Sequence, residues 1–479
     1  MKFNRLLYIL PIFSIVACQP EIDDIDFNGG SADFSRTVAV GNSLTAGFQS
    51  NALSLEGQMN SLPSIIAGQL KLVGGGEFTQ PLLSGEAGAK GAGVEASLIV
   101  NNLLLPELSL APSKDCLGET SLSPQILSAP YPITSFLELD ASLRPFNNIG
   151  VPGAKIGNVT MPGYGSSQGN PFFARFAETP METMLQAAMK TNATFFQLWI
   201  GNNDVLGYAT TGGNEGGDAV TPVNTFSSAF KEILDSLAKN GAKGVVANIP
   251  DVTSIPFFTT IPTGVELTQE QADQLNSPMA YGAYNGGLDA MVANQALSQD
   301  EADERKIIFK AGLNPFVVLD PSLTDLTGFN PALLSMRQIK VGELLTLRTP
   351  SDSLKCARWG SAKPIPGNFH LTNAELVTIK NAVSGYNDII KQEAQARQLA
   401  FVDVNARLDE LATVGIKVSG INFTSELVRG GAFSLDGVHP STRGYAIIAN
   451  DFIDAINKTY NANIPKVDVT RYPALETAM

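Results

Sequence analysis

The sequence has 479 residues, of which 44% are hydrophobic and 16% are charged. This balance is typical of a folded globular protein and argues against a disordered or fibrous chain. The formal net charge is −14 at pH 7. A protein this acidic repels phosphate backbones, so we expect no nucleic-acid partner.

The N-terminus predicts export followed by lipid anchoring. Lys2 and Arg5 precede an apolar run at 6–16, and small residues then lead to Cys18. This arrangement predicts a signal peptide over 1–17, and the apolar run is too short to cross a bilayer. Because the pattern stops at cysteine, it resembles the lipobox of bacterial lipoproteins, which implies that Cys18 is the lipidated first residue. We therefore expect a protein anchored to a bacterial membrane, the outer membrane facing the periplasm or the exterior. An ordinary signal peptide that contains a cysteine is the alternative.

Two further cysteines, Cys116 and Cys356, lie far apart in the sequence. An even number of cysteines in an exported protein favours a disulfide between them. Two separate buried thiols fit the sequence equally well, because it does not give the distance that decides the matter.

Short apolar runs alternate with helical patterns along most of the chain. Four of these runs predict buried strands: 37–40, 195–200, 244–249 and 399–404. Apolar residues at helical spacing follow at 226–237, and the capping box Thr372-x-x-Glu375 opens another helix. This alternation predicts an α/β fold with a mostly parallel sheet that helices cover on both faces. Such sheets bind ligands at the carboxyl ends of their strands.

Composition divides the chain further. The acidic segment at 18–35 predicts a flexible tether, 36–460 a single α/β domain, and 461–479 a C-terminal tail. Two stretches, at about 72–145 and about 257–370, interrupt the alternation. We interpret both as insertions, because the strand–helix alternation resumes after each of them. In the second insertion, helices are expected to start at Thr268 and Ser298, and a hairpin is expected around 312–315.

Histidine is scarce, since only His370 and His439 are present. A multi-histidine metal site is therefore excluded, and we expect no metal. His370 precedes the capping box, where a surface or capping role is expected. His439 follows Asp436 by three residues, a spacing at which the carboxylate can accept a hydrogen bond from the imidazole Nδ1–H. Such a bond fixes the tautomer and stabilises the imidazolium during proton transfer.

Ser43 follows the first predicted strand, where the chain turns toward a helix. A serine there projects from the carboxyl edge of the sheet, and its backbone N–H can face an oxyanion. By itself, a helix N-cap is the simpler interpretation. Two other loops favour a nucleophile. Asn203 follows the strand at 195–200 and can donate its side-chain amide to a developing negative charge, while Gly153 can donate its backbone N–H without obstructing the substrate.

Four sequence blocks resemble, in order, those of the SGNH (GDSL) hydrolases: Gly41-Asn42-Ser43-Leu44, Gly153, Gly201-x-Asn203-Asp204 and Asp436-x-x-His439. The resemblance implies a flavodoxin-like three-layer α/β/α fold interrupted by the two insertions. It also implies that Ser43 is the nucleophile, with Gly153 and Asn203 completing an oxyanion hole with the Ser43 N–H. His439 would be the base and Asp436 the residue that orients it. Asn42 departs from the family name, which has aspartate there, so we expect altered hydrogen bonding at this point but no loss of activity.

We therefore expect a serine ester hydrolase, an acyl esterase or lipase, that needs no metal or organic cofactor. Its expected partners are an ester substrate and, through Cys18, a membrane. The leucine-rich part of the first insertion is either an apolar lid, which would favour fatty acyl esters, or additional core packing. Two alternatives stay open: a glycan O-acetyl esterase, and a non-catalytic lipoprotein that binds glycan or protein on the same scaffold.

Overall fold

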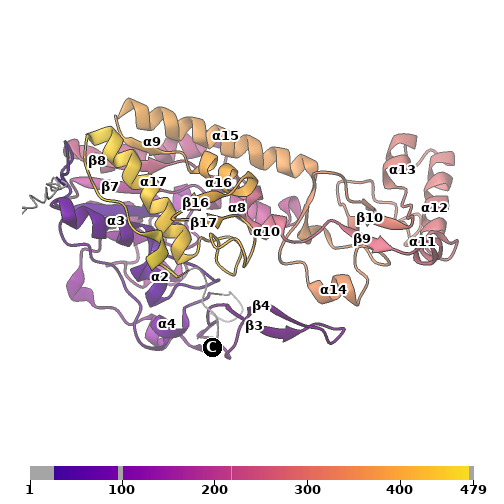
Figure 1. Ribbon diagram of the computed structural model, residues 1–479. Helices are drawn as coiled ribbons and strands as arrows, with labels where there is room; N and C mark the ends of the chain where they lie inside the picture. The colour runs from indigo at the N-terminus through magenta and orange to yellow at the C-terminus, as the bar shows by residue number, and fades with distance from the viewer. Residues whose placement is uncertain (1–25, 95–100, 217, 474–479) are drawn as a thin grey trace, which may run out of the picture.

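A computed structural model describes residues 26–94, 101–216 and 218–473 of the chain (Figure 1). The predicted signal peptide at 1–17 and the predicted lipidation site Cys18 lie outside the described residues. Within the described part, none of the helices combines the length and the apolar character needed to span a membrane.

A five-stranded sheet forms the centre of the molecule, in the order β15-β8-β7-β1-β6. All of its pairings are parallel. Its strands are β1 (Thr37–Gly41), β6 (Asn148–Gly150), β7 (Phe195–Trp199), β8 (Lys243–Ala247) and β15 (Ala400–Val402). Most of their residues are buried, as expected when both faces of a parallel sheet are covered. All four strands predicted from apolar runs are present. The fifth, β6, lies in a segment that the sequence analysis treats as a loop.

Helices cover the two faces of this sheet (Figure 1). On one face, α17 (Thr442–Tyr460) packs beside α3 (Leu62–Leu70). Two side chains of β7 contact this layer. Phe195 packs against Tyr460 and Trp199 packs against Phe452, and both partners lie on α17. The second layer contains α7 (Met184–Met189), α9 (Val223–Leu237) and α15 (Asn373–Ala396). The α15 helix begins with the predicted capping box at Thr372.

Shorter elements complete the fold. The remaining helices are α1 (Ser43–Ala46), α2 (Leu55–Met59), α4 (Gly85–Lys90), α6 (Pro171–Ala174), α8 (Asn203–Thr210), α10 (Pro256–Thr259), α11 (Gln269–Asn276), α12 (Tyr281–Ala293), α13 (Gln299–Arg305), α14 (Ser351–Lys355) and α16 (Val404–Thr413). The described residues also form six antiparallel strand pairs: β2 (Leu103–Leu104) with β5 (Tyr131–Pro132), β3 (Ser109–Lys114) with β4 (Thr120–Gln125), β9 (Gly264–Leu267) with β10 (Gly312–Pro315), β11 (Val317–Leu319) with β12 (Met336–Gln338), β13 (Leu344–Leu345) with β14 (His370–Leu371), and β16 (Ile416–Val418) with β17 (Ile421–Phe423).

The segment at about 257–370, the second of the two that interrupt the alternation, projects from the sheet as a lobe (Figure 1). Helices α11, α12 and α13 and the strands around them enclose a hydrophobic core separate from the main one. Thr268 and Ser298 cap α11 and α13, as predicted. The prediction of a hairpin around 312–315 is wrong. These residues form β10, which pairs with the distant β9, because the partner strand lies before the helices of the lobe and not beside β10 in the sequence.

The leucine-rich part of the first interruption contributes to the main core at Leu104, which is fully buried. The hairpin β3–β4 follows it and carries Leu117 and Leu122 as exposed side chains. The leucines of this stretch are therefore divided between core packing and surface.

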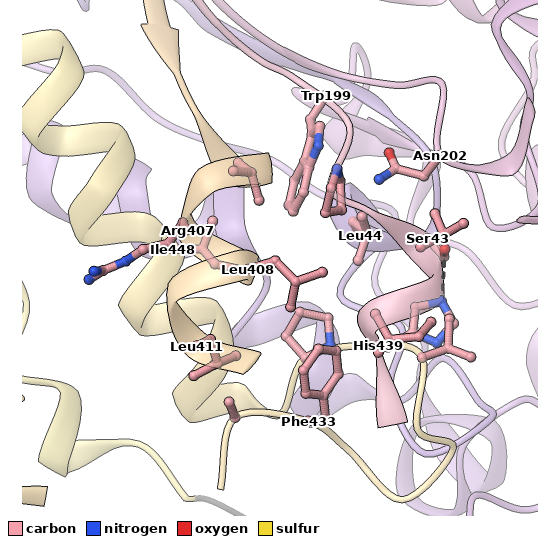
Figure 2. A pocket seen from close by; sticks show the side chains of 18 of the residues that line it. Ser43, Leu44, Trp199, Asn202, Arg407, Leu408, Leu411, Phe433, His439 and Ile448 are labelled. Carbon is pink, nitrogen blue, oxygen red and sulfur yellow. Dashed lines mark hydrogen bonds between the residues drawn. The ribbon is translucent and has the colours of Figure 1, made fainter. Parts of the chain in front are cut away.

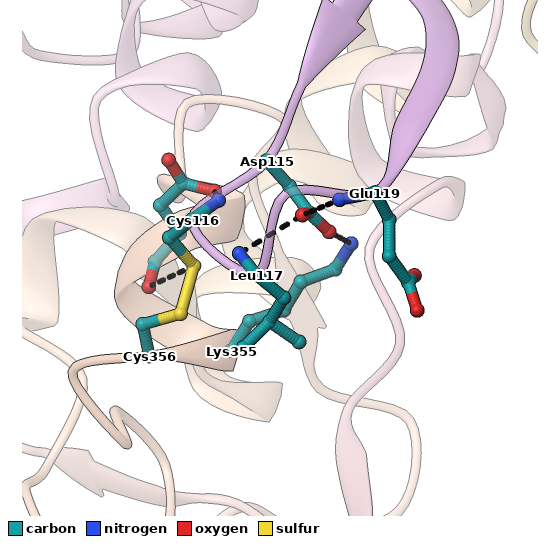
Figure 3. Close-up of a disulfide and its surroundings, with 7 residues drawn as sticks. Asp115, Cys116, Leu117, Glu119, Lys355 and Cys356 are labelled. Carbon is teal, nitrogen blue, oxygen red and sulfur yellow. Dashed lines mark hydrogen bonds and ion pairs between the residues drawn. A yellow bond between two sulfur atoms is a disulfide. The ribbon is translucent and has the colours of Figure 1, made fainter.

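A disulfide between Cys116 and Cys356 joins the segment at about 72–145 to the one at about 257–370, across 240 residues of sequence (Figure 3). Cys116 lies in the turn between β3 and β4, and Cys356 follows α14. Beside it, Lys355 Nζ lies 2.8 Å from Asp115 Oδ2. The alternative of two separate buried thiols is excluded, since the two sulfur atoms are bonded and Cys116 is exposed.

Replacing both Cys116 and Cys356 by serine should lower the free energy of unfolding by about 2–5 kcal/mol, because the cross-link restricts the unfolded chain over a long loop. The hairpin at 109–125 should also become easier to cleave. Denaturant unfolding and limited proteolysis with mass spectrometry of the fragments measure these two effects. Unchanged stability together with unchanged cleavage of the hairpin would show that the cross-link does not restrain it.

Of the predicted tether at 18–35, residues 18–25 lie outside the described residues, and residues 28–35 contact the α/β domain. The Ser31 N–H donates to the Tyr460 carbonyl at the end of α17, and Phe34 is buried in the main core. The described part of the predicted tail behaves similarly, since Ile464 and Val469 are buried. The first segment is bonded to the end of α17, whereas the second follows this helix back to its start, where the Arg443 N–H donates to the Pro473 carbonyl.

Candidate functional site

Ser43, His439 and Asp436 form a continuous hydrogen-bonded chain at the carboxyl end of β1. The Oγ of Ser43 lies 2.9 Å from Nε2 of His439 (Figure 2), and Nδ1 of His439 lies 2.9 Å from Oδ2 of Asp436. All three side chains are largely buried. The fold thus brings together residues that are 396 positions apart in the sequence.

Ser43 is the first residue of α1, and the cap of this helix is Asn42. The Asn42 Oδ1 accepts a hydrogen bond from the Leu44 N–H at 3.0 Å. The interpretation of Ser43 as an N-cap is therefore wrong, and the Ser43 hydroxyl is free to bond to His439. Gly41 makes this tight turn possible, because a Cβ there would lie 2.4 Å from the carbonyl oxygen of Trp199.

The asparagine at position 42 has a second hydrogen bond that aspartate would not provide. Its Nδ2 donates to Oδ1 of Asn202, 3.3 Å away, and both side chains are buried. A carboxylate has no N–H to donate, so Asn42→Asp would place two oxygens against each other. Asn202 thus supplies the acceptor that the Asn42 amide needs.

Asp436 accepts hydrogen bonds from several backbone N–H groups as well as from His439. Its Oδ1 accepts from Val438 and His439, at 2.8 and 2.9 Å, and its Oδ2 accepts from Asn51 at 2.9 Å. Burial would raise the pKa of this carboxyl, but the charge of His439 and these hydrogen bonds outweigh burial and lower the pKa to about 2. Asp436 is therefore ionised at neutral pH.

The turn between Asp436 and His439 rests on the start of the projecting lobe. Gly437 has a φ of +71°, and a Cβ there would lie 3.1 Å from the backbone nitrogen of Phe257. The Phe257 N–H also donates to the Gly437 carbonyl at 2.9 Å. The residues that lead into the lobe thus support the loop that carries the histidine.

Gly153 and Asn203, the two predicted oxyanion donors, belong to loops that are bonded to each other. Asn203 begins α8, and its Nδ2 donates to the Ala154 carbonyl at 3.0 Å. An amide nitrogen carries two hydrogens, so one is left for a ligand. Gly153 is exposed and has a φ of +82°, a conformation that favours glycine.

Asp204 also bonds to this loop, a role that could not be assigned from the sequence. Its Oδ2 accepts from the Ile156 N–H at 2.9 Å. Burial raises the pKa of this carboxyl to about 6. Its place directly after Asn203 at the start of a helix was the only available signal, and the acceptor role depends on a loop 48 residues earlier.

His370 is not at the surface, so the expected surface role is wrong. It is 2% exposed, and its Nε2 lies 3.1 Å from Oε2 of Glu343. Glu343 also accepts two hydrogen bonds from Arg337, at 2.7 and 2.8 Å. Both partners lie in the segment at about 257–370, and the sequence around position 370 does not indicate these contacts. This buried network explains His370 without any part in the Ser43 site.

An apolar pocket opens beside Ser43 and His439 (Figure 2). Asn202 and Asn203 also line it, and Asn202 lies on the same side as Ser43 in Figure 2. Within the residues that the structure describes, no group of three or more His, Cys, Asp or Glu side chains is placed to hold a metal ion. No protein-family model matches the chain, and no curated protein sequence matches it.

Proposed function

We propose that this protein is a serine hydrolase of carboxylic esters, with an active site and a flavodoxin-like fold of the SGNH (GDSL) type. The observation that carries the proposal is the chain of hydrogen bonds from Ser43 through His439 to Asp436. It lies at the carboxyl edge of a parallel sheet, where such folds bind ligands. A pure binding protein gains nothing from a hydroxyl aligned on an imidazole that a buried carboxylate orients.

In the proposed first step, the Ser43 Oγ attacks the ester carbonyl carbon while His439 Nε2 takes the hydroxyl proton. The carbonyl oxygen becomes an oxyanion, which accepts hydrogen bonds from the Ser43 and Gly153 N–H groups and the Asn203 amide. The carbon–oxygen bond to the alcohol then breaks, and His439 returns its proton to the departing alcohol. Asp436, ionised and fixed by three backbone N–H groups, stabilises the imidazolium in between.

In the second step, a water molecule attacks the acyl group bonded to Ser43. His439 accepts the proton of this water as its oxygen bonds to the carbonyl carbon, and the same donors stabilise the second oxyanion. Collapse releases the carboxylic acid and returns the proton to Ser43. The residues in place are sufficient for both steps, and neither step uses a metal or organic cofactor.

The proposal includes the cellular location. The signal-peptide pattern that ends at Cys18 supports an exported lipoprotein anchored to a bacterial membrane. The disulfide between Cys116 and Cys356 supports an oxidising compartment, since such bonds persist outside the cytoplasm.

Hydrolysis of simple esters tests the proposal. The purified protein should release p-nitrophenol from p-nitrophenyl acetate and butyrate far faster than buffer alone, with the same rate in the presence of EDTA. Release that is no faster than buffer for every p-nitrophenyl ester from acetate to octanoate would overturn it and favour a non-catalytic binding protein.

Replacing Asn203 by alanine should lower kcat for p-nitrophenyl butyrate by roughly 10²–10³, because one oxyanion donor is lost. Asn203→Asp keeps the size of the side chain but removes the N–H donor, so we expect a loss at least as large. Asn294→Ala, at an exposed asparagine in the lobe, is the matched control and should keep full activity. Steady-state kinetics, with a melting curve for each variant, measure the effect. Full activity in a folded Asn203→Ala variant would remove Asn203 from the oxyanion hole.

A further inference from the structure

The pocket beside Ser43 has one polar end and one apolar end. Ser43, His439 and Asn202 lie at the polar end (Figure 2). In Figure 2, Leu411 and Ile448 lie on the side opposite to Ser43 and His439. The apolar walls come from α16, α17 and the adjoining segments: Leu408, Leu411, Ile416, Phe433, Ile447 and Val252, all of them buried.

The polar groups in these walls are already bonded to other residues. Arg407 lines the pocket, but its Nε donates to Asp451 at 3.0 Å and its Nη1 to Glu410 at 2.7 Å. Its guanidinium points away from the pocket in Figure 2. The indole N–H of Trp199 donates to the Asn248 carbonyl at 3.1 Å. A sugar or another polar group in this pocket would lose its hydrogen bonds to water without replacing them, so the fitting occupant is a hydrocarbon.

The size of the pocket limits the length of this hydrocarbon. The cavity has a volume of about 100 Å³. An apolar cavity of roughly 150 Å³ is known to accept benzene, which has about six carbon atoms, so this one fills with about four. It is too large to be filled by the methyl group of an acetyl ester and too small for a long fatty acyl chain.

We propose that the pocket binds the acyl chain of the substrate and selects short acyl groups of about four to six carbons, counting the carbonyl carbon. This inference rests on the proposed ester hydrolysis and assigns its substrate class. The acyl group stays bonded to Ser43 until water attacks, whereas the alcohol must depart first. A pocket that starts at Ser43 and ends among buried leucine and isoleucine side chains therefore fits the acyl chain better than the leaving group.

The chain-length profile tests the inference. Each added methylene that enters the pocket should raise kcat/KM by roughly fourfold. We expect p-nitrophenyl butyrate to exceed the acetate by roughly 15-fold for its two added methylenes, followed by a fall from hexanoate to decanoate. A profile that is flat or falling from acetate to hexanoate would overturn the inference, as would one that still rises to palmitate.

Variants at Leu411 should move this profile in opposite directions. Leu411→Phe narrows the pocket and should lower the ratio of butyrate to acetate kcat/KM about tenfold, whereas Leu411→Ala enlarges it and should raise the ratio of octanoate to butyrate about tenfold. The matched control is Val414→Phe at the end of the same helix, where the side chain is 75% exposed and does not line the pocket. It should leave both ratios unchanged. If one Leu411 variant fails to fold, the other still decides, and a folded variant with the wild-type profile overturns the inference.

Two further measurements test whether the pocket binds the acyl chain and not the alcohol, and whether binding occurs independently of ester hydrolysis. Alkyl acetates of increasing alcohol length should react at similar rates, and a steep gain with alcohol length would overturn the assignment of the pocket to the acyl chain. Binding of butyramide to the Ser43→Ala, Trp359→Phe protein should shift the fluorescence of Trp199, the remaining tryptophan, which lines the pocket. That shift without any ester hydrolysis by the wild type would overturn the proposed function alone. Ester hydrolysis without the shift would overturn the pocket assignment alone.

Discussion

Replacing Ser43 by alanine should lower kcat for p-nitrophenyl butyrate by roughly 10⁴–10⁶. The variant keeps the proposed oxyanion donors and the pocket but lacks the proposed nucleophile, so any remaining rate comes from direct attack by water. The change removes the hydrogen bond between the Ser43 hydroxyl and His439, which is 2.9 Å long. It leaves the cap of α1 in place, because Asn42 provides that cap. The fold should therefore survive the change, with a melting temperature close to that of the wild type.

The matched control for this variant is Ser35→Ala, at an exposed serine just before β1. It should keep full activity. The double variant Ser43→Ala, His439→Ala should be hardly slower than Ser43→Ala alone, because the two side chains act as one unit. A folded Ser43→Ala protein that retains a substantial fraction of the wild-type kcat would show that another group is the nucleophile.

Replacing Asp436 by asparagine should lower kcat by roughly 10³–10⁴, with little change in KM. Asparagine has almost the same shape, but it is neutral, so it no longer stabilises the imidazolium of His439. The amide nitrogen of the new side chain would also face backbone N–H donors that contact Oδ1 or Oδ2 of Asp436 in the wild type, including the N–H of Asn51. The imidazole is then free to adopt the tautomer in which Nε2 carries the proton and cannot accept one from Ser43.

Steady-state kinetics of the Asp436→Asn variant, alongside Asp33→Asn at an exposed position, measure this effect. Near-normal kcat in the folded Asp436→Asn protein would mean that the carboxylate has no part in the reaction. A large rise in KM with an unchanged kcat would instead place Asp436 in substrate binding.

The architecture of the sheet could be predicted from local patterns because four of its strands lie in apolar runs of four to six residues. β6 could not, since its three residues include Asn148 and Gly150 and lack a pattern of their own. Its pairing with β1 depends on tertiary contacts. The hairpin expected at 312–315 failed for the same reason, because turn-forming residues do not specify a partner strand.

The site was only partly predictable. The spacing of Asp436 and His439 on one turn is local, so their contact could be expected from sequence. Whether Ser43 capped a helix or faced the histidine depended on its neighbour Asn42, whose side chain takes the cap. The pocket lay beyond prediction, since its walls combine α16, α17 and residues after β7 and β8, which approach one another only in the folded chain.

Labelling with a fluorophosphonate probe tests the central claim most directly, because the probe bonds covalently to a serine whose hydroxyl is activated by a base. The folded wild-type protein should carry one adduct, which mass spectrometry of the peptides places on Ser43. Labelling should be lost in His439→Ala and after heat denaturation. No adduct on the folded wild type, or an adduct on another serine that persists in Ser43→Ala, would contradict the assignment of Ser43 as the nucleophile.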